Sequence, residues 1–237
     1  MASGDGVGNA LHSSKQDLGL GRITEELTCS SMQVGLFTQR DIRLDHPKVQ
    51  GQISCEGIST RIWCRCDEIF SPVVKMTTLC FMLGIVAVDN LELIQLDVKT
   101  AFLHGDLWEE IYMEQPKGFV ASGQEYLVCR LRKSLYGLKQ APRQWYKKFD
   151  DFIQSVGFSK SDEDQCLFTK TAQDGSPVLI IYVDDMLLSG RHAGELTELV
   201  QKLWLKFAMK DLGSARHILG KKISLHRDKR QLFLSQT

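Results

Sequence analysis

The chain has 237 residues, of which 43% are hydrophobic and 24% charged, and its 29 basic side chains balance its 29 acidic ones. This length and composition exclude a disordered chain, a collagen and a small disulfide scaffold, and they favour one domain of ordinary size, alone or with an appendage. The neutral net charge argues against general coating of nucleic acid, but it leaves room for a local basic surface.

The sequence predicts an intracellular protein without a membrane span. The longest apolar run, residues 79–88, is too short to cross a bilayer, and the first residues, MASGDGVGNALHSSKQ, lack the charged and then apolar regions of a signal peptide. The seven cysteines include no Cys-x-x-Cys pair, and Cys64 and Cys66 are poorly spaced for a zinc site.

The first part of the chain shows no sustained periodicity. Residues 1–45 are rich in Gly, Ser and polar side chains, which predicts a poorly ordered segment. Residues 46–66, HPKVQGQISCEGISTRIWCRC, contain three Cys and one Trp without clean alternation. A conventional globular pattern begins at Asp67, so we assign 67–237 to one folded domain.

Regular elements follow in that domain. Ser71-Pro72 is typical of the start of a helix, which the apolar period continues to Val86. The patterns further predict a buried strand at 91–98, a helix at 140–156 with Gly157 as its cap, a tight hairpin at 178–188, a helix at 195–207, and strands at 218–225 and 231–234. The irregular interleaving favours an α+β fold with helices over one face of a sheet.

Two adjacent carboxylates, Asp184 and Asp185, interrupt the apolar sequence of the predicted hairpin, IIYVDDMLL. Carboxylates near a core are costly unless a cation or hydrogen bonds compensate them. The alternative is that Asp-Asp only forms the turn, as Asp often does.

A third carboxylate, Asp97, ends the predicted strand LIQLDV. One acid at a strand end and two on a hairpin can converge on one sheet and hold two divalent cations, an arrangement that suits in-line phosphoryl transfer. Mg²⁺ is the natural choice because every ligand is a hard oxygen.

The segment from Arg130 to Lys148 contains basic residues but no acid, and Tyr136, Trp145 and Tyr146 lie among them. Its basic residues are Arg130, Arg132, Lys133, Lys139, Arg143, Lys147 and Lys148. Such a pattern suits a nucleic-acid backbone with stacked bases. A solvated helix face with Trp145 in the core is the alternative, and for Trp145 itself we favour the core.

These motifs together resemble the reverse transcriptase of copia-type LTR retrotransposons, most closely those of plants. The resemblance rests on QLDVKTAFLHGDL, KSLYGLKQAPRQWY and YVDDM in this order, with EIFSPVVK, EEIYMEQPKGF and KDLGSARHILG as connecting blocks. It runs from about Asp67 to Thr237. It implies a right-hand polymerase palm, a ferredoxin-like antiparallel sheet with helices on one face, with partial fingers and no thumb.

The resemblance also implies roles for single residues. Asp97 and Asp184 would ligate two Mg²⁺ ions, for which Mn²⁺ can substitute, and Asp185 would complete the cluster. The nucleotide-binding positions are Phe102, which would block a ribose 2′-OH, with Tyr136 and Gly137. The primer- and template-binding positions are Tyr182, Lys139, Arg143, Leu219 and Gly220. Lys210 is either the acid that protonates pyrophosphate or a solvated lysine.

Residues 46–66 depart from the family, which has a fingers segment resembling YKARLVVKGFQQEYGVD before EIFSPVVK. A back-translation of Val49–Cys66, with codons chosen within their degeneracy and read one base later, yields that motif. We therefore predict a frameshift near residue 48 that recovers near residue 66. The chain also stops at LFLSQT, which predicts that thumb, connection and ribonuclease H are missing.

The sequence thus predicts an RNA-directed DNA polymerase domain, degenerate and with little activity as written. Its partners would be an RNA template, a DNA primer and dNTPs, in cytoplasmic particles or the nucleus by family analogy, and the oligomeric state stays open. Two alternatives remain: a non-catalytic nucleic-acid-binding remnant that uses residues 130–148, and an inert translated relic that does not fold stably.

Overall fold

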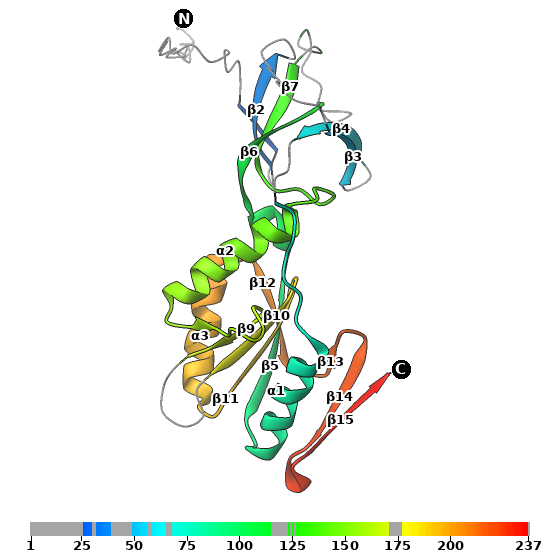
Figure 1. Cartoon of the computed structure of the whole chain (residues 1–237). Helices are drawn as coiled ribbons and strands as arrows, with labels where there is room; N and C mark the ends of the chain where they lie inside the picture. The colour runs from blue at the N-terminus through cyan, green and yellow to red at the C-terminus, as the bar shows by residue number, and fades with distance from the viewer. Residues whose placement is uncertain are drawn as a thin grey trace, which may run out of the picture.

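The computed structural model describes the backbone of residues 26–29, 32–38, 49–55, 58–64, 68–114, 123, 125, 127–170 and 177–236. Within these ranges it describes side chains from residue 68 onward, except at 114 and 127. Figure 1 shows an elongated molecule, with helices α1, α2 and α3 in its lower part and a separate sheet at its upper end.

The central sheet has six described strands in the order β12-β5-β11-β10-β9-β8, and neighbouring strands are antiparallel. The strands are β5 (Glu92–Val98), β8 (Ser159–Lys160), β9 (Leu167–Thr169), β10 (Val178–Tyr182), β11 (Asp185–Gly190) and β12 (Met209–Ser214). The predicted strand at 91–98 and the hairpin at 178–188 are confirmed as β5 and the β10–β11 pair. Apolar residues of β5 and β11 are buried on both faces, which explains why their sequences are mostly apolar.

Helices α2 (Ala141–Ser155) and α3 (Ala193–Lys206) pack on the same face of this sheet. The Phe149 ring of α2 meets Phe168 of β9 edge-on at 5.7 Å between centroids, and Leu196 of α3 lies over Gly190 at the end of β11. Both helices were predicted, and Gly157, with a φ of 93°, follows the end of α2 as expected. The α+β class and the antiparallel sheet are thus confirmed.

A second sheet has the order β1-β2-β7-β6-β4-β3. Its strands are β1 (Glu26–Cys29), β2 (Met32–Thr38), β3 (Val49–Cys55), β4 (Ile58–Cys64), β6 (Asp106–Glu114) and β7 (Leu127–Lys133). The first two fall within the segment 1–45, whose residues 1–25 lie outside the described residues, so poor order of that segment stays a prediction. β3 and β4 fall within 46–66, where a frameshift likewise stays a prediction.

A third sheet, β13-β14-β15, lies beside α1 (Met76–Val88) in the lower right of Figure 1. Its strands are β13 (His217–Ile218), β14 (Lys221–His226) and β15 (Gln231–Gln236), and the short 3₁₀ helix η3 (Arg227–Lys229) joins the last two. The strand predicted at 218–225 is confirmed from Lys221 onward as β14, and the one predicted at 231–234 is confirmed as β15. The start of the first is wrong, because Leu219 and Gly220 have φ values of 52° and 70° and turn the chain between β13 and β14.

The predicted start of the first helix at Ser71-Pro72 is also wrong. α1 begins at Met76, after Lys75 in an extended conformation. The Lys75 backbone N–H donates to Asp164 Oδ2 at 2.9 Å, and the Ser71 hydroxyl donates to the Pro142 carbonyl at 3.3 Å. These tertiary bonds hold the preceding segment in place of a first helical turn. Within the described residues, no helix has the length and apolar content needed to cross a membrane.

Candidate active site

The three predicted carboxylates come together at one end of the central sheet. Asp97 of β5 pairs directly with Asp185 of β11, and Asp184 occupies the turn that precedes β11. The Val98 N–H donates to the Asp184 carbonyl at 2.9 Å, so this turn is bonded to β5 as well as to β10. Strand pairing thus brings together acids that are far apart in the sequence.

The carboxylates of this cluster repel one another. Burial, the negative charge of Asp184 and, more weakly, that of Asp97 raise the pKa of Asp185, while a hydrogen bond from Gln95 opposes the shift. Gln95 lies two residues before Asp97, on the same face of β5. A divalent cation would remove this repulsion, and carboxylate oxygens are the donors that Mg²⁺ prefers. The donor set therefore fits Mg²⁺, although no three metal-ligating side chains already converge among the described residues.

Strand β12 borders the other side of β5. Its Lys210 pairs in register with Asp97, so Asp97 has a carboxylate as one cross-strand neighbour and a lysine as the other. The Lys210 side chain is exposed. Lys210 therefore lies near the carboxylates, as the acid that protonates pyrophosphate would, and it also reaches solvent, as a solvated lysine would.

The nucleotide-binding candidates also come together. Phe102 lies in the short 3₁₀ helix η2 (Ala101–His104), which starts four residues after Asp97. Its ring packs against Tyr136, with 4.7 Å between centroids and an angle of 42° between planes. Gly137 has a φ of 97°, a conformation that a residue with a side chain rarely adopts. The structure thus places these three residues together, although they come from separate motifs.

Most of the basic side chains in the 130–148 segment are paired with acids from elsewhere in the chain. Asp106 binds both Lys133, at 2.5 Å, and Lys148. Arg130 lies 3.5 Å from Glu110, and Arg143 pairs with Glu68. The sequence showed no acid within the segment and so missed these partners. Lys139, by contrast, is exposed.

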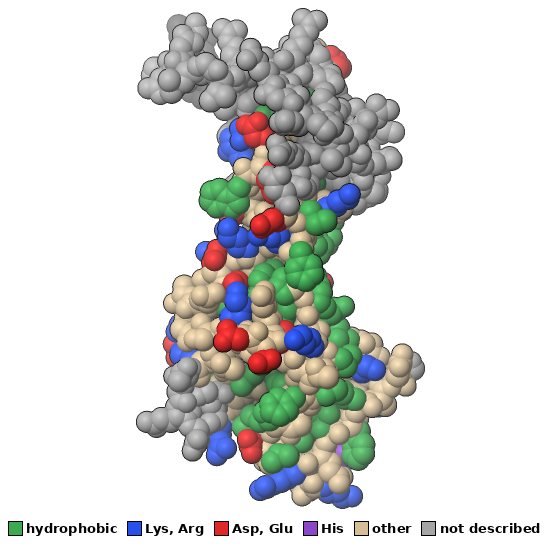
Figure 2. Space-filling model, viewed as in Figure 1, with side chains coloured by type: hydrophobic (Ala, Val, Ile, Leu, Met, Phe, Trp, Pro, Cys, Tyr) green, Lys and Arg blue, Asp and Glu red, His purple; other side chains and the backbone are tan. Residues whose placement is uncertain are grey.

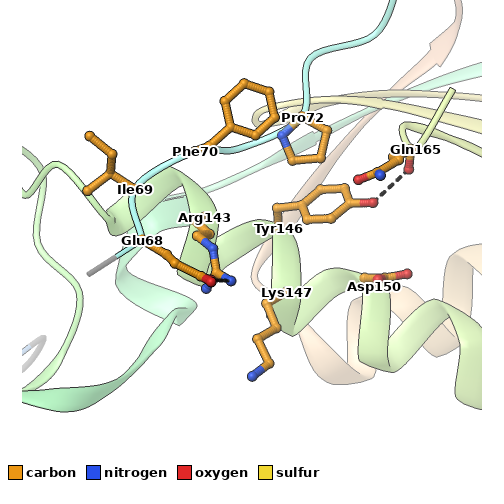
Figure 3. Close-up of a pocket in the computed structure, with 9 residues that line it drawn as sticks. All are labelled: Glu68, Ile69, Phe70, Pro72, Arg143, Tyr146, Lys147, Asp150 and Gln165. Carbon is orange, nitrogen blue, oxygen red and sulfur yellow. Dashed lines mark hydrogen bonds and ion pairs between the residues drawn. The ribbon is translucent and has the colours of Figure 1, made fainter. Parts of the chain in front are cut away.

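Arg143 and Glu68 line a pocket of about 650 Å³ on the outer side of α2, shown in Figure 3. The Tyr146 hydroxyl donates to the Gln165 carbonyl across it, at 2.7 Å. None of the three clustered carboxylates lines this pocket. Arg143 is thus paired with Glu68 at this pocket, whereas Tyr182, opposite Asp185 in the hairpin, lies beside the carboxylate cluster. Leu219 and Gly220 form the turn between β13 and β14.

Several known proteins are similar to this chain in sequence. A reverse transcriptase (RNA-dependent DNA polymerase) family model matches residues 33–237. The chain belongs to the reverse transcriptase family. It is 55% identical over 171 residues, or 72% of its length, to the retrovirus-related Pol polyprotein from transposon TNT 1-94 of Nicotiana tabacum. It is 35% identical over 173 residues, 73% of its length, to the Pol polyprotein from transposon RE1 of Arabidopsis thaliana.

These relatives are much longer than this reverse transcriptase chain. The matched part is 13% of the tobacco polyprotein and 12% of the Arabidopsis one. A yeast relative, the putative transposon Ty5-1 protein of Saccharomyces cerevisiae, is 34% identical over 125 residues, which are 53% of this chain and 41% of the relative. The resemblance to the reverse transcriptase of copia-type retrotransposons is therefore confirmed.

Three residues near the candidate site were not predicted as part of it. The sequence could have indicated Gln95, because Gln95 shares a strand face with Asp97. It gave no indication of Asp106, since the two lysines that pair with Asp106 come from a distant strand and a distant helix. Trp145 was assigned to the core and is 1% exposed, but its indole Nε1–H also donates to the Val183 carbonyl at 2.6 Å.

Proposed function

We propose that this chain is the polymerase part of a copia-type reverse transcriptase and that it extends a DNA primer along an RNA template by a two-metal mechanism. The observation that carries the proposal is the pairing of Asp97 with Asp185 next to the Asp184 turn. The primer 3′-oxygen forms a bond to the α-phosphorus of a dNTP, the bond from that phosphorus to the β-phosphate oxygen breaks, and pyrophosphate leaves.

Asp97, Asp184 and Asp185 would hold Mg²⁺. The chemistry that a bound Mg²⁺ pair supplies is activation of the attacking hydroxyl and stabilisation of the charge on the phosphoryl group. The Phe102 ring, packed on Tyr136, would fill the space of a ribose 2′-OH and so select dNTPs. Gly137 would let the backbone approach the nucleotide closely, and Tyr182 would lie near the primer end.

The other site residues would act on the substrates from outside the cluster. The turn at Leu219 and Gly220 would support the primer, and the exposed Lys139 would contact a phosphate. Arg143 would do so only by leaving Glu68, so we assign it the smaller contribution. Lys210, opposite Asp97, would protonate the departing pyrophosphate.

We also propose that residues 46–66 are a fingers segment translated in a shifted frame, which lowers activity. The one-base shift that restores a fingers motif supports this proposal. Sequencing of the transcript over codons 40–70 tests it directly: a nucleotide sequence that does not yield the motif in another frame rules it out.

The test of activity is Mg²⁺-dependent primer extension on an RNA template. The chain is compared with a version whose segment 46–66 is restored to the alternative frame, and each is also made with Asp184→Asn. Asp151→Asn, on the exposed side of α2, is the matched control. We expect extension by the restored chain, its loss with Asp184→Asn, and its retention with Asp151→Asn. Extension that survives Asp184→Asn would contradict the proposed mechanism.

A further inference from the structure

We propose that Trp145 is a positioning residue of the reverse transcriptase site, which fixes the turn that carries Asp184 through a hydrogen bond from its indole ring. The inference deepens the proposed function and rests on it. The juxtaposition that supports it is a buried indole N–H on α2 that is aimed at the backbone of the carboxylate turn.

The turn itself is conformationally demanding. Val183, the residue between Tyr182 and Asp184, has a φ of 55°. A β-branched side chain makes this conformation unfavourable, so the surroundings must hold it. The Trp145 Nε1–H donates to the carbonyl of this same residue at 2.6 Å, and the Val98 N–H binds the next carbonyl, that of Asp184, at 2.9 Å. Two donors from two other elements therefore define the path of the turn.

The ring of Trp145 also contacts the elements that carry the other site residues. His104, two residues after Phe102 in η2, lies 5.8 Å from the indole between centroids. Phe207, three residues before Lys210, meets it edge-on at 5.1 Å. Burial lowers the pKa of His104, which favours the neutral imidazole among the aromatic rings. The Trp145 side chain thus contacts the carboxylate turn, η2 and the segment that precedes β12.

A role in packing alone makes a different prediction. Phe149 is one turn along the same face of α2, is fully buried and also contacts Phe207, at 6.2 Å, but it has no donor group. If Trp145 served only the core, replacing either residue would destabilise the fold and leave the turn unchanged. If Trp145 positions the turn, loss of its donor alters the turn even where the ring is kept.

The first test uses Trp145→Phe, which keeps an aromatic ring without the donor, and Phe149→Leu as the packing control. Hydrogen exchange of the Val98 amide, whose acceptor is the Asp184 carbonyl, reports on the turn without any metal. We expect about tenfold faster exchange in Trp145→Phe, the size expected for one lost hydrogen bond. Exchange is corrected for global stability, and Phe149→Leu should leave the corrected rate within twofold. Equal corrected rates in wild type and Trp145→Phe would overturn the inference.

The second test measures Mn²⁺ affinity by electron paramagnetic resonance on the full chain. Trp145→Phe should weaken binding about tenfold, as one lost hydrogen bond would, whereas Phe149→Leu should bind like wild type. If Phe149→Leu weakens binding as much as Trp145→Phe, the effect is general packing and the inference is wrong. If Asp184→Asn leaves Mn²⁺ affinity unchanged, the proposed metal site fails, while the exchange of Val98 still decides the role of Trp145.

Discussion

Asp97 and Asp185 are direct cross-strand partners in the antiparallel ladder of β5 and β11. Side chains at such positions share a face of the sheet and lie close together. Together with Asp184 in the turn and burial, this arrangement raises the pKa of Asp185. The negative charge of Asp185 therefore destabilises the folded state when no cation is bound.

The first prediction concerns stability without a divalent cation. Because Asp185 is only half-buried, solvent screening limits the effect to roughly 1 kcal/mol. Asp185→Asn should therefore raise the melting temperature at pH 7.5 by about 2–4 °C in a domain of this size. The folded-state pKa of Asp185 is raised, so the folded state favours the protonated, neutral form of this side chain. The contribution of Asp185 to stability is therefore complete below its ordinary pKa of 3.8 and is lost as the pH rises through the raised pKa.

The gain from Asp185→Asn should therefore shrink as the pH falls towards 4, which thermal melts across this range measure. Addition of Mg²⁺ should raise the melting temperature of wild type more than that of the variant. A variant less stable than wild type at pH 7.5 in the presence of a chelator would contradict the argument.

The second prediction concerns the contact between η2, β7 and α2. A Cβ added to Gly105 would lie 2.9 Å from Gln144 Cβ, 3.0 Å from Ser134 Oγ and 3.1 Å from the backbone of Gln144. Gly105→Ala should thus destabilise the protein by about 1–3 kcal/mol through overpacking. Gly190→Ala is the control, because its closest contact, also 2.9 Å, is the flexible end of Leu196. Urea unfolding should show the larger loss for Gly105→Ala.

The third prediction concerns Asp106. Burial opposes its ionisation, but hydrogen bonds and charges from Lys133 and Lys148 outweigh burial and lower its pKa. Its stabilising effect is therefore present above the ordinary value of 3.8 and is lost as the pH falls through the lowered value. Its side chain is 38% exposed, so solvent screening limits the cost of Asp106→Asn at neutral pH to about 1 kcal/mol.

Acid unfolding between pH 5 and pH 2 measures this effect. The difference between wild type and Asp106→Asn should vanish at the acidic end, and Asp151→Asn should behave like wild type throughout. A difference for Asp106→Asn that persists unchanged to pH 2 would show that its ion pairs are not the cause.

The fourth prediction concerns substrate choice and rests on the proposed function. Phe102→Val opens space beside Tyr136, so incorporation of ribonucleotides relative to deoxynucleotides should rise by about tenfold or more. The ratio of kcat/KM for a ribonucleotide and its deoxy counterpart measures this effect. Phe81→Val, on the exposed surface of α1, should leave the ratio unchanged.

The fifth prediction concerns α1, which contains no charged residue. Phe81, Ile85 and Val88 are 71%, 37% and 59% exposed, and Figure 2 shows exposed apolar side chains on this face of the molecule. Apolar patches of this kind promote association. Phe81→Lys should therefore lower self-association, as measured by analytical ultracentrifugation, with little change in melting temperature. Equal association of the two proteins would assign the effect to another surface.

Local patterns predicted much of the fold. β5 and the β10–β11 hairpin follow from mostly apolar sequences, and α2 follows from the helical spacing of Trp145 and Phe149. The start of α1 and the β13–β14 turn could not be predicted. The first depends on Asp164, which is distant in sequence, and the second on left-handed backbone at Leu219, where no local preference demands it.

The sequence by itself determined the identity of the three carboxylates, their family and the strands that bear them, because apolar runs and motifs are local properties of a chain. The tertiary structure alone decided which partners they meet. Antiparallel register places Asp185 and Lys210 on either side of Asp97, and folding of α2 over the sheet brings the Trp145 indole to Val183. The physical reason is that long-range pairing depends on how whole elements pack, which no single segment encodes.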